Sequence, residues 1–461
     1  MCKCLWMFLA PVVILIAGSY YLIHFKSPPP LPHFDLDEWW GPKDLANTKQ
    51  DTSIRPFKIE FDEKTVKDLR QRLNNHRKWT PPLEGIAFEY GFNSNQLDDW
   101  VDYWSNKYDF KAREAALNKY PQFKTKIQGL DIHFIRVTPK NTKKEVVPLL
   151  LLHGWPGSVR EFYESIPILT AESKDRDFVL ELVIPSIPGY GFSEAAARPG
   201  LGPPQIAVVF RNLMHRLGYK KFFVQGGDAG AVIAASMVTL FPKEISGFHC
   251  NMPFSQAPST TFLTLLGTVF PSLVVESQYK ERMYPLGSKY AFLIEESGYT
   301  HIQATKPDTI GIAVNESPVS LLTYILEKFS TWTDKEHKFL PDGGLSKYSK
   351  DQLIDNLMIY WTSNSITTSF RLYAESLNSR TMGYQLDTIP SPVPTWILQA
   401  KNELLYLPSV VLRLKFPNLV KASHFENGGH FLALELPKEF SEDVLEAIKQ
   451  IRDVKTVKTE L

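Results

Sequence analysis

The chain has 461 residues, of which 44% are hydrophobic and 22% are charged. These shares are close to the averages of globular proteins, so they argue against a disordered, collagen-like or polytopic membrane protein. The 51 Lys and Arg residues nearly balance the 50 Asp and Glu residues, which argues against a nucleic-acid partner because such a partner selects a basic surface. The three cysteines, two of which are Cys2 and Cys4, form neither a disulfide framework nor a cysteine-based zinc site.

The N-terminal segment differs in composition from the rest. The 21 residues from Leu5 to Phe25 carry no formal charge, and Lys3 and Lys26 bracket them. A helix of this length crosses about 30 Å of hydrocarbon. A cleaved signal peptide is the alternative, but its apolar core usually has only about 7 to 15 residues. We therefore expect residues 1–32 to form a single uncleaved transmembrane helix and a proline-rich spacer, with the lysines leaving its orientation open.

Residues 33–120 are polar, aromatic and rich in helical patterns. Val66, Leu69 and Leu73 follow one another at helical spacing. We expect this stretch to form an N-terminal cap or arm.

Beyond residue 120, short apolar runs that end in glycine, proline or a polar residue alternate with helical patterns. Such alternation is typical of a mostly parallel sheet with helices on both faces. The expected strands are residues 132–137, 146–152, 180–185, 221–225, 395–399 and 419–424. The last helix carries Phe440, Val444, Ile448 and Ile451 on one face.

A helical and aromatic block interrupts this alternation. It extends from about residue 252 to residue 376. We expect it to be a lid inserted into an α/β core, whose first part is residues 121–251 and whose second part is residues 377–461.

The sequence Gly226-Gly227-Asp228-Ala229-Gly230 lies between an expected strand and an expected helix. This is the spacing of a nucleophile elbow, G-x-S-x-G, with aspartate in the place of serine. A carboxylate held above the sheet by such a turn is a nucleophile towards an alkyl carbon. The alternative is an aspartate that caps a helix after a glycine turn.

The residues that follow the later strands favour the catalytic interpretation. Glu403 comes after the strand at 395–399, and His430 comes after the strand that ends in His424. Nucleophile, acid and histidine follow one another in the order of the α/β-hydrolases. We expect His430 to activate water and Glu403 to hold its imidazole in the required tautomer. His424 is the alternative histidine, and its position at a strand end favours a structural role.

The sequence His153-Gly154-Trp155-Pro156-Gly157-Ser158 follows the strand at 146–152. A turn of this kind supplies a backbone N–H to an oxyanion hole, here from Trp155, and the second N–H comes from the residue after the nucleophile, Ala229. The alternative is a tight turn with an exposed tryptophan.

Several long motifs carry a resemblance to a known family. They are DEWWGP, HGWPGS, PSIPGYGFS, GGDAG, ESGYTHIQATKPDT, EKFSTWT and GGHFLALELP. Together with the N-terminal apolar segment, the chain resembles the microsomal epoxide hydrolases over essentially its whole length, and most closely the insect juvenile hormone epoxide hydrolases. The resemblance implies an α/β-hydrolase fold with a helical lid, an N-terminal arm and one transmembrane helix.

The resemblance also implies a mechanism. Asp228 attacks the epoxide, Tyr299 and Tyr373 on the lid donate hydrogen bonds to its oxygen, and His430 with Glu403 activates the water that hydrolyses the ester. The product is a vicinal diol, and neither a metal nor an organic cofactor is needed. The family relationship further implies the endoplasmic reticulum membrane, with the catalytic body in the cytosol.

Other possibilities stay open. Family members carry tryptophan after the nucleophile, whereas this chain has Ala229, which brings turnover into question and allows a catalytically weak hormone-binding protein. A haloalkane dehalogenase has a similar elbow but needs tryptophan or asparagine N–H donors for halide. We expect the substrate to be an apolar epoxide, either juvenile hormone or one of the fatty or xenobiotic epoxides of general detoxification. The sequence leaves the oligomeric state open.

Overall fold

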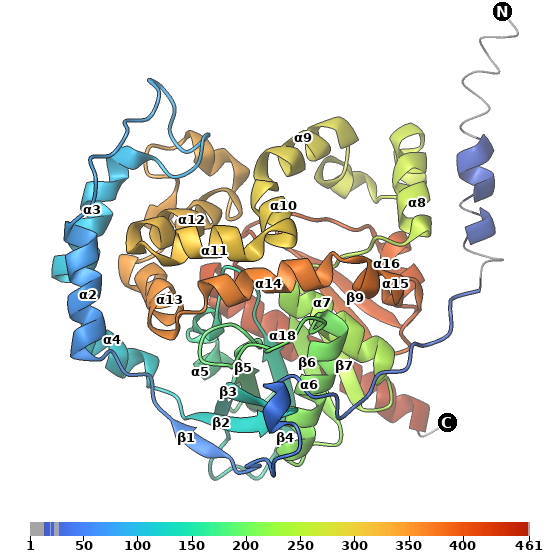
Figure 1. Cartoon of the computed structure of the whole chain (residues 1–461). Helices are drawn as coiled ribbons and strands as arrows, with labels where there is room; N and C mark the ends of the chain where they lie inside the picture. Colours follow the sequence, from blue (N-terminus) through green and yellow to red (C-terminus); the bar gives the residue numbers. More distant parts are fainter. Residues whose placement is uncertain (1–12, 19, 23–26, 460–461) are drawn as a thin grey trace, which may run out of the picture.

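A nine-stranded sheet forms the centre of the computed structural model, which describes residues 13–18, 20–22 and 27–459 (Figure 1). The strands are ordered β1-β2-β3-β5-β4-β6-β7-β8-β9. From β5 to β9 neighbouring strands are parallel, whereas β1, β2, β3 and β5 pair in an antiparallel manner. The bounds are β1 Arg55–Phe57, β2 Gln122–Ile127, β3 Leu130–Val137, β4 Glu145–Leu152, β5 Phe178–Pro185, β6 Phe222–Gly226, β7 Ile245–Cys250, β8 Thr395–Gln399 and β9 Leu419–His424.

The parallel strands were predictable because both of their faces are covered. Every residue of β5, β6 and β8 is buried, and a strand buried on both faces reads as a continuous apolar run. All six expected strands are present. Three further strands were not predicted: β1, which has three residues, β2, which has only two apolar residues among six, and β7, where Gly247 and His249 interrupt the apolar run.

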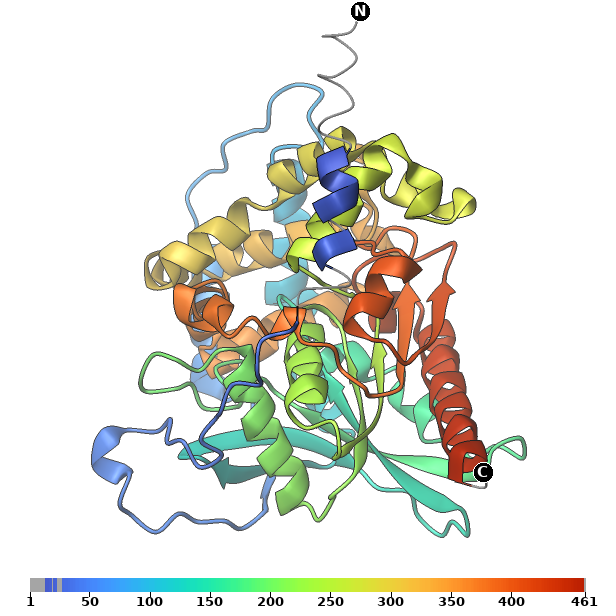
Figure 2. The same cartoon turned by 90° about the vertical axis from the view of Figure 1, so that its right-hand side faces the viewer.

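Helices cover both faces of the sheet. Figure 2 shows α6 and α7 on one side and α18 on the other. α18 packs against α5, β7 and β8, and its four predicted apolar positions are almost fully buried. The predicted orientation of this last helix is therefore confirmed. The helices of the core are α5 Ile166–Leu169, α6 Pro203–Arg216, α7 Asp228–Leu240, α16 Ser409–Lys415, α17 Leu432–Glu435 and α18 Pro437–Thr459.

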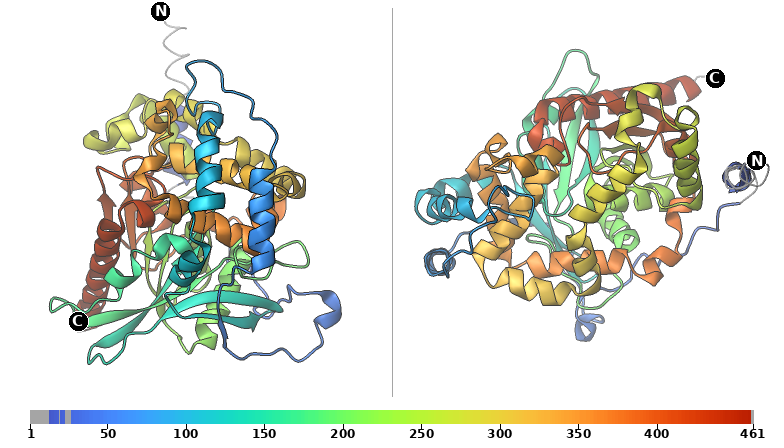
Figure 3. Two further views of the ribbon diagram at one scale, coloured as in Figure 1. Left: turned by 90° about the vertical axis from the view of Figure 1, so that its left-hand side faces the viewer. Right: turned by 90° about the horizontal axis from the view of Figure 1, so that it is seen from above.

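A helical block separates β7 from β8. Residues 251–394, all of which the structure describes, form helices and turns and no strand. Figure 1 shows this block above the sheet, and the view from above in Figure 3 shows it spread over the molecule. Its helices are α8 Pro258–Val269, α9 Leu286–Glu296, α10 Gly298–Thr305, α11 Pro307–Asn315, α12 Pro318–Thr331, α13 Lys350–Ser363, α14 Ile366–Ser376 and α15 Ser379–Gly383.

The N-terminal arm stands beside the helical block (Figure 3). Its helices are α2 Glu63–Asn74, α3 Leu97–Asp102 and α4 Phe110–Leu117. Leu69 and Leu73 of α2 are fully buried, so the helical spacing found in the sequence does mark the packed face of this helix.

The buried carboxylate of Asp355 on α13 ties the arm to the rest of the molecule. It accepts hydrogen bonds from Tyr108 Oη at 2.9 Å, from Arg113 Nε at 2.9 Å and from Arg160 Nε at 3.0 Å. A buried carboxylate is tolerated only when it is paired in this way. The arm, the core and the helical block therefore meet at one ion-paired centre.

The expected transmembrane segment lies largely outside the described residues. Its described part, Val13–Leu22, is helical apart from one undescribed position, and Leu15 packs against Leu263 and Leu266 of α8 and Val411 of α16. Among the described residues no single helix is long and apolar enough to cross a membrane. The pair formed by α11 and α12 meets the length and composition criteria together, but it is bent by 115°, and most of α12 is buried.

Candidate active site

The turn after β6 holds Asp228 in a strained conformation. Asp228 has a φ of 48° and begins α7, a region that residues with a side chain enter rarely. A Cβ atom on Gly226 would collide with the backbone of Gly230, and a Cβ on Gly230 would collide with the carbonyl oxygen of Leu152. Both glycines are therefore needed for the sharp strand-to-helix turn that the sequence predicted.

The structure brings together the three side chains that were expected to act in sequence. His430 Nε2 lies 3.4 Å from Asp228 Oδ2, and His430 Nδ1 lies 2.7 Å from Glu403 Oε1. Glu403 Oε1 also accepts the backbone N–H of Leu404 at 2.8 Å. These residues follow β6, β8 and β9, whose parallel carboxyl ends meet at one edge of the sheet.

The surrounding charges control the protonation of His430. Burial by itself would lower its pKa, but the carboxylates of Glu403 and Asp228 outweigh burial and raise the pKa well above the usual value. When Asp228 carries a negative charge, the imidazole is therefore an imidazolium at neutral pH. Removing that charge would lower the pKa of His430 and favour the neutral, basic form.

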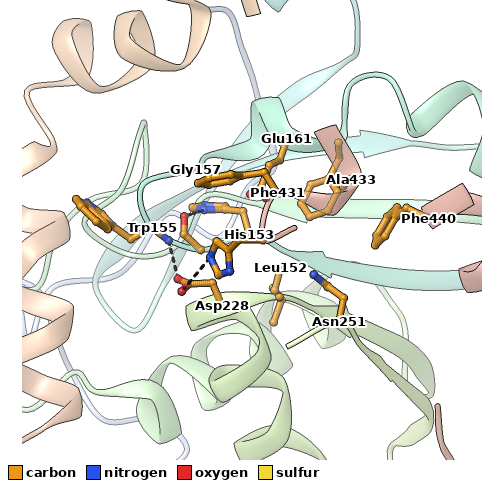
Figure 4. A pocket seen from close by; sticks show the side chains of 14 residues that line it. Leu152, His153, Trp155, Gly157, Glu161, Asp228, Asn251, Phe431, Ala433 and Phe440 are labelled. Carbon is orange, nitrogen blue, oxygen red and sulfur yellow. Dashed lines mark hydrogen bonds and ion pairs between the residues drawn. The ribbon is translucent and has the colours of Figure 1, made fainter. Parts of the chain in front are cut away.

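The loop after β4 contacts the other oxygen of the same carboxylate. The backbone N–H of Trp155 donates to Asp228 Oδ1 at 2.8 Å (Figure 4). This leaves Oδ2 as the oxygen on the side of His430. Ala229 N belongs to the first turn of α7, where backbone N–H groups have no partner within the helix.

Neighbouring elements hold the Trp155 loop in place. His153 accepts the N–H of Ile187 at Nε2, 3.2 Å away, and its Nδ1 lies 3.0 Å from the carbonyl oxygen of Gly154. Burial lowers the pKa of His153 to about 4, so the ring is neutral and bridges the two backbone segments. From α13, Asn356 Nδ2 donates to Pro156 O and Tyr360 Oη donates to Gly157 O, both at 2.8 Å.

Two tyrosines of the helical block lie beside the tryptophan of that loop. Tyr299 on α10 stacks on Trp155 with ring centroids 5.1 Å apart, and Tyr373 on α14 approaches Tyr299 edge-on at 5.6 Å. Burial raises the pKa of both phenols, and the charge of Asp228 adds to this effect. Both hydroxyls therefore stay protonated and able to donate.

Two cavities meet at Asp228. The larger has a volume of about 580 Å³, is mostly apolar, and is lined by Tyr299, Tyr373 and Ala229 together with Asp228. The smaller has a volume of about 20 Å³ and is lined by His430 together with Asp228 (Figure 4). The phenols line only the large cavity and His430 lines only the small one, so the nucleophile separates the two.

Comparison with known proteins assigns the family. Residues 54–162 match the model described as epoxide hydrolase N terminus, and residues 147–274 match the alpha/beta hydrolase fold. The chain is 59% identical to the juvenile hormone epoxide hydrolase of Bombyx mori over 98% of both chains, and 44% identical to epoxide hydrolase 1 of Sus scrofa over 88% of this chain and 91% of that one. The chain belongs to the epoxide hydrolase family.

The fold of the hydrolase agrees with this assignment. The crystal structure of juvenile hormone epoxide hydrolase from the silkworm Bombyx mori superposes with a TM-score of 0.91 at 60% identity, covering 92% of this chain and 100% of that chain. The Aspergillus niger epoxide hydrolase superposes with a TM-score of 0.71 at 26% identity, covering 87% and 97%. The predicted α/β-hydrolase fold is therefore confirmed.

His424, the alternative histidine, lies away from both cavities. Its ring stacks on Tyr279 with centroids 3.8 Å apart, and burial lowers its pKa. It lines neither of the cavities that meet at Asp228.

Two partly buried glutamates of the hydrolase, Glu435 and Glu161, were not expected from the sequence. Glu435 accepts the backbone N–H of Gly429 and that of Phe431, each at 2.9 Å, and so brackets His430. Burial raises the pKa of Glu435 to about 7. Glu161 lines the small cavity. Neither residue stands in a motif that marks it, although Glu435 lies four residues after Phe431, a spacing that allows contact within a helical turn.

Among the residues that the structure describes, no group of three or more histidine, cysteine or acidic side chains is arranged to hold a metal ion.

Proposed function

We propose that this hydrolase converts an apolar epoxide of the juvenile hormone type into a vicinal diol. The observation that carries the proposal is the position of Asp228, which faces a large apolar cavity with two protonated phenols on one side and a histidine on the other. The names of several relatives, among them two from Ctenocephalides felis at 46% identity, support the hormone as substrate.

In the proposed first step, Asp228 Oδ2 attacks one carbon of the oxirane in the large cavity. The C–O bond of the ring breaks, and Tyr299 and Tyr373 donate hydrogen bonds to the oxygen on which negative charge develops. This alkoxide then takes up a proton, which His430 releases when the charge of Asp228 is gone and its pKa falls. Asp228 Oδ1 keeps its contact with Trp155 N, so the new ester has its carbonyl oxygen in the oxyanion hole, where Ala229 N is the second donor.

In the proposed second step, water in the small cavity attacks Asp228 Cγ. Ester formation has removed the negative charge of Asp228, and His430 therefore becomes able to accept the proton of the water. Glu403 keeps the imidazole oriented through the 2.7 Å contact at Nδ1. The carbonyl group of Asp228 then re-forms as the bond between Cγ and Oδ2 breaks, and the alkoxide released with Oδ2 takes the proton from His430. The second proton of the water passes from Asp228 to His430, which restores the carboxylate and the imidazolium.

Replacing either phenol is expected to slow ester formation. Tyr299→Phe and Tyr373→Phe should each lower its rate by about 10²-fold, the usual cost of removing one donor to a developing oxyanion. Tyr324→Phe is the matched control, because Tyr324 packs in the same aromatic cluster at 5.9 Å from Trp155 but does not line the cavity. The rate of ester formation is measured by rapid quench for all three variants. Equal loss of rate at all three positions would contradict the proposed roles of Tyr299 and Tyr373.

We propose that the helical block acts as a lid over the core. It supplies both phenols, and its helix α13 holds the Trp155 loop through Asn356 and Tyr360. The same block therefore covers the large cavity and assembles the site. We keep the unit boundaries proposed from the sequence, at residues 32, 120, 251 and 376, although β1 of the arm pairs with β2 of the core.

We further propose that residues 1–32 anchor the hydrolase in the endoplasmic reticulum membrane as a single helix, with the body in the cytosol. α8, against which Leu15 of this segment packs, and the adjoining η5 (Pro271–Leu273) expose large apolar side chains, including Val269 at 50% and Leu273 at 66%. The full chain should remain in the membrane pellet after extraction with alkaline carbonate, and its release would contradict the anchor.

The substrate test uses membranes that contain the full chain. Selective diol formation from juvenile hormone, relative to an aryl epoxide, would support the proposal, whereas preference for the aryl epoxide would favour general detoxification. Tight hormone binding with no diol would indicate a binding protein. Ala229, which lines the large cavity, would then be the first residue to test as the cause of the lost turnover. Ala229→Trp would then test whether the tryptophan restores turnover. Halide release from a haloalkane would instead indicate a dehalogenase.

A further inference from the structure

The small cavity behind Asp228 has the size and lining of a site for one water molecule. Its volume is about 20 Å³, and a single water needs at least about 10 to 15 Å³ measured in this way. Its polar lining includes Asp228, His430, Glu161 and Asn251, among apolar walls such as Phe431 and Phe440. A water there has several polar partners and is confined on its other sides.

Glu161 reaches this cavity because the loop has a glycine opposite it. The residue lies on the short helix η4 (Val159–Phe162), and a Cβ atom on Gly157 would be 2.5 Å from Glu161 Oε2. The missing side chain at Gly157 therefore leaves the space that the carboxyl group occupies. A hydrogen bond fixes Asn251, since its Oδ1 accepts Gln225 Nε2 at 2.7 Å. The Nδ2 group of Asn251 is therefore the side that can donate into the cavity.

Glu161 takes no part in the two steps proposed above, and among the described residues no lysine or arginine forms an ion pair with it. Burial raises the pKa of its carboxyl group to about 8, with His430 opposing and Asp228 adding to the effect. A carboxyl group of this kind is both a donor and an acceptor of hydrogen bonds.

We propose that Glu161 binds the hydrolytic water and directs it at the ester. The water gives one proton towards His430 Nε2 and the other towards a carboxyl oxygen of Glu161, so a lone pair of its oxygen faces Asp228 Cγ. During attack the new O–Cγ bond forms, the proton moves to His430 Nε2, and the displaced electron pair resides on Oδ1. Glu161 neither gains nor loses a proton in this step.

The inference rests on the proposed two-step function, and the experiment separates the two. The full-length chain is mixed rapidly with the epoxide, and the ester is followed by intact mass while the diol is measured in parallel. Glu161→Leu keeps the approximate volume but removes the partner of the water. We expect hydrolysis of the ester to slow by about 10²-fold, as for a reacting group misplaced by roughly 1 Å, whereas the rate of ester formation stays unchanged.

Rescue and control variants distinguish water binding from a structural role. Glu161→Gln keeps hydrogen-bonding atoms at the same place and should hydrolyse the ester within a few-fold of the native rate. Glu164→Gln is the matched control, because Glu164 lies two residues beyond the end of η4, pairs with Arg160 at 2.8 Å and does not line the cavity. It should change neither step.

Three results would overturn the inference: native hydrolysis by Glu161→Leu, equal slowing of both steps, or failure of Glu161→Gln to rescue. If Glu161→Leu does not fold, Glu161→Asp decides, since the shortened carboxylate should slow hydrolysis without slowing ester formation, and an unchanged rate of hydrolysis would overturn the inference. Absence of any ester in the native protein and in all variants would refute the two-step function itself.

Discussion

His430→Gln is expected to trap the enzyme as a stable ester with its substrate. The imidazole lines the small cavity and is the proposed general base of the second step, whereas the proposed ester formation takes place in the large cavity without it. Loss of a positioned general base costs typically about 10²- to 10⁴-fold in rate. Intact mass spectrometry should show one substrate mass added to the chain, formed at nearly the native rate.

The native enzyme should show the same behaviour at low pH. The pKa of His430 is raised by two carboxylates, and ester formation removes the charge of one of them. Below the pKa of the ester state the imidazole stays protonated and cannot accept a proton. Hydrolysis of the ester should therefore slow as the pH falls, and the ester should accumulate. An ester fraction that does not depend on pH, or a His430→Gln variant that forms diol at the native rate, would contradict the role of His430.

Asp228→Ala is expected to abolish both the ester and the diol. The variant removes the only atom proposed to form a bond to the epoxide, and removing one member of a group that acts as a unit can cost about 10⁶-fold. Hormone binding should persist, because the large cavity is lined mainly by apolar side chains. The measurements are diol formation and equilibrium hormone binding by the Asp228→Ala variant, of which only the second should remain.

Asp308→Ala is the control for this variant. Asp308 forms an exposed ion pair with Arg371 at 2.7 Å, a kind of contact that contributes at most about 1 kcal/mol to stability. This variant should keep native turnover. Diol formation by Asp228→Ala at more than trace levels would mean that water attacks the epoxide directly.

Much of the active site could be predicted because its residues follow strands in a fixed order. Parallel strands end at one edge of the sheet, so residues as far apart as Asp228, Glu403 and His430 are brought together once their strands are recognised. The glycines around Asp228 leave room for a sharp turn, and this requirement is local and therefore visible in the sequence. The positions of Tyr299 and Tyr373 came from family motifs, since an aromatic residue on a helix reads as ordinary core.

Other features depend on tertiary contacts that no local pattern records. β2 has only two apolar residues among six, and it becomes a strand by pairing with β3 and with the three-residue β1 in the antiparallel part of the sheet. Glu161 reads as a polar residue in a short helical turn, and its position beside His430 depends on the missing side chain of Gly157. The small cavity itself arises where β4, β6, β7 and the last helices meet.

One single-turnover experiment in water enriched in ¹⁸O tests the central claim most directly. Enzyme in excess over juvenile hormone completes one cycle, after which the diol and the peptide that contains Asp228 are weighed separately. Because Oδ2 leaves with the diol and an oxygen of water replaces it, the account predicts the label in the Asp228 carboxylate and unlabelled diol. Label in the diol alone after one turnover would contradict the covalent mechanism.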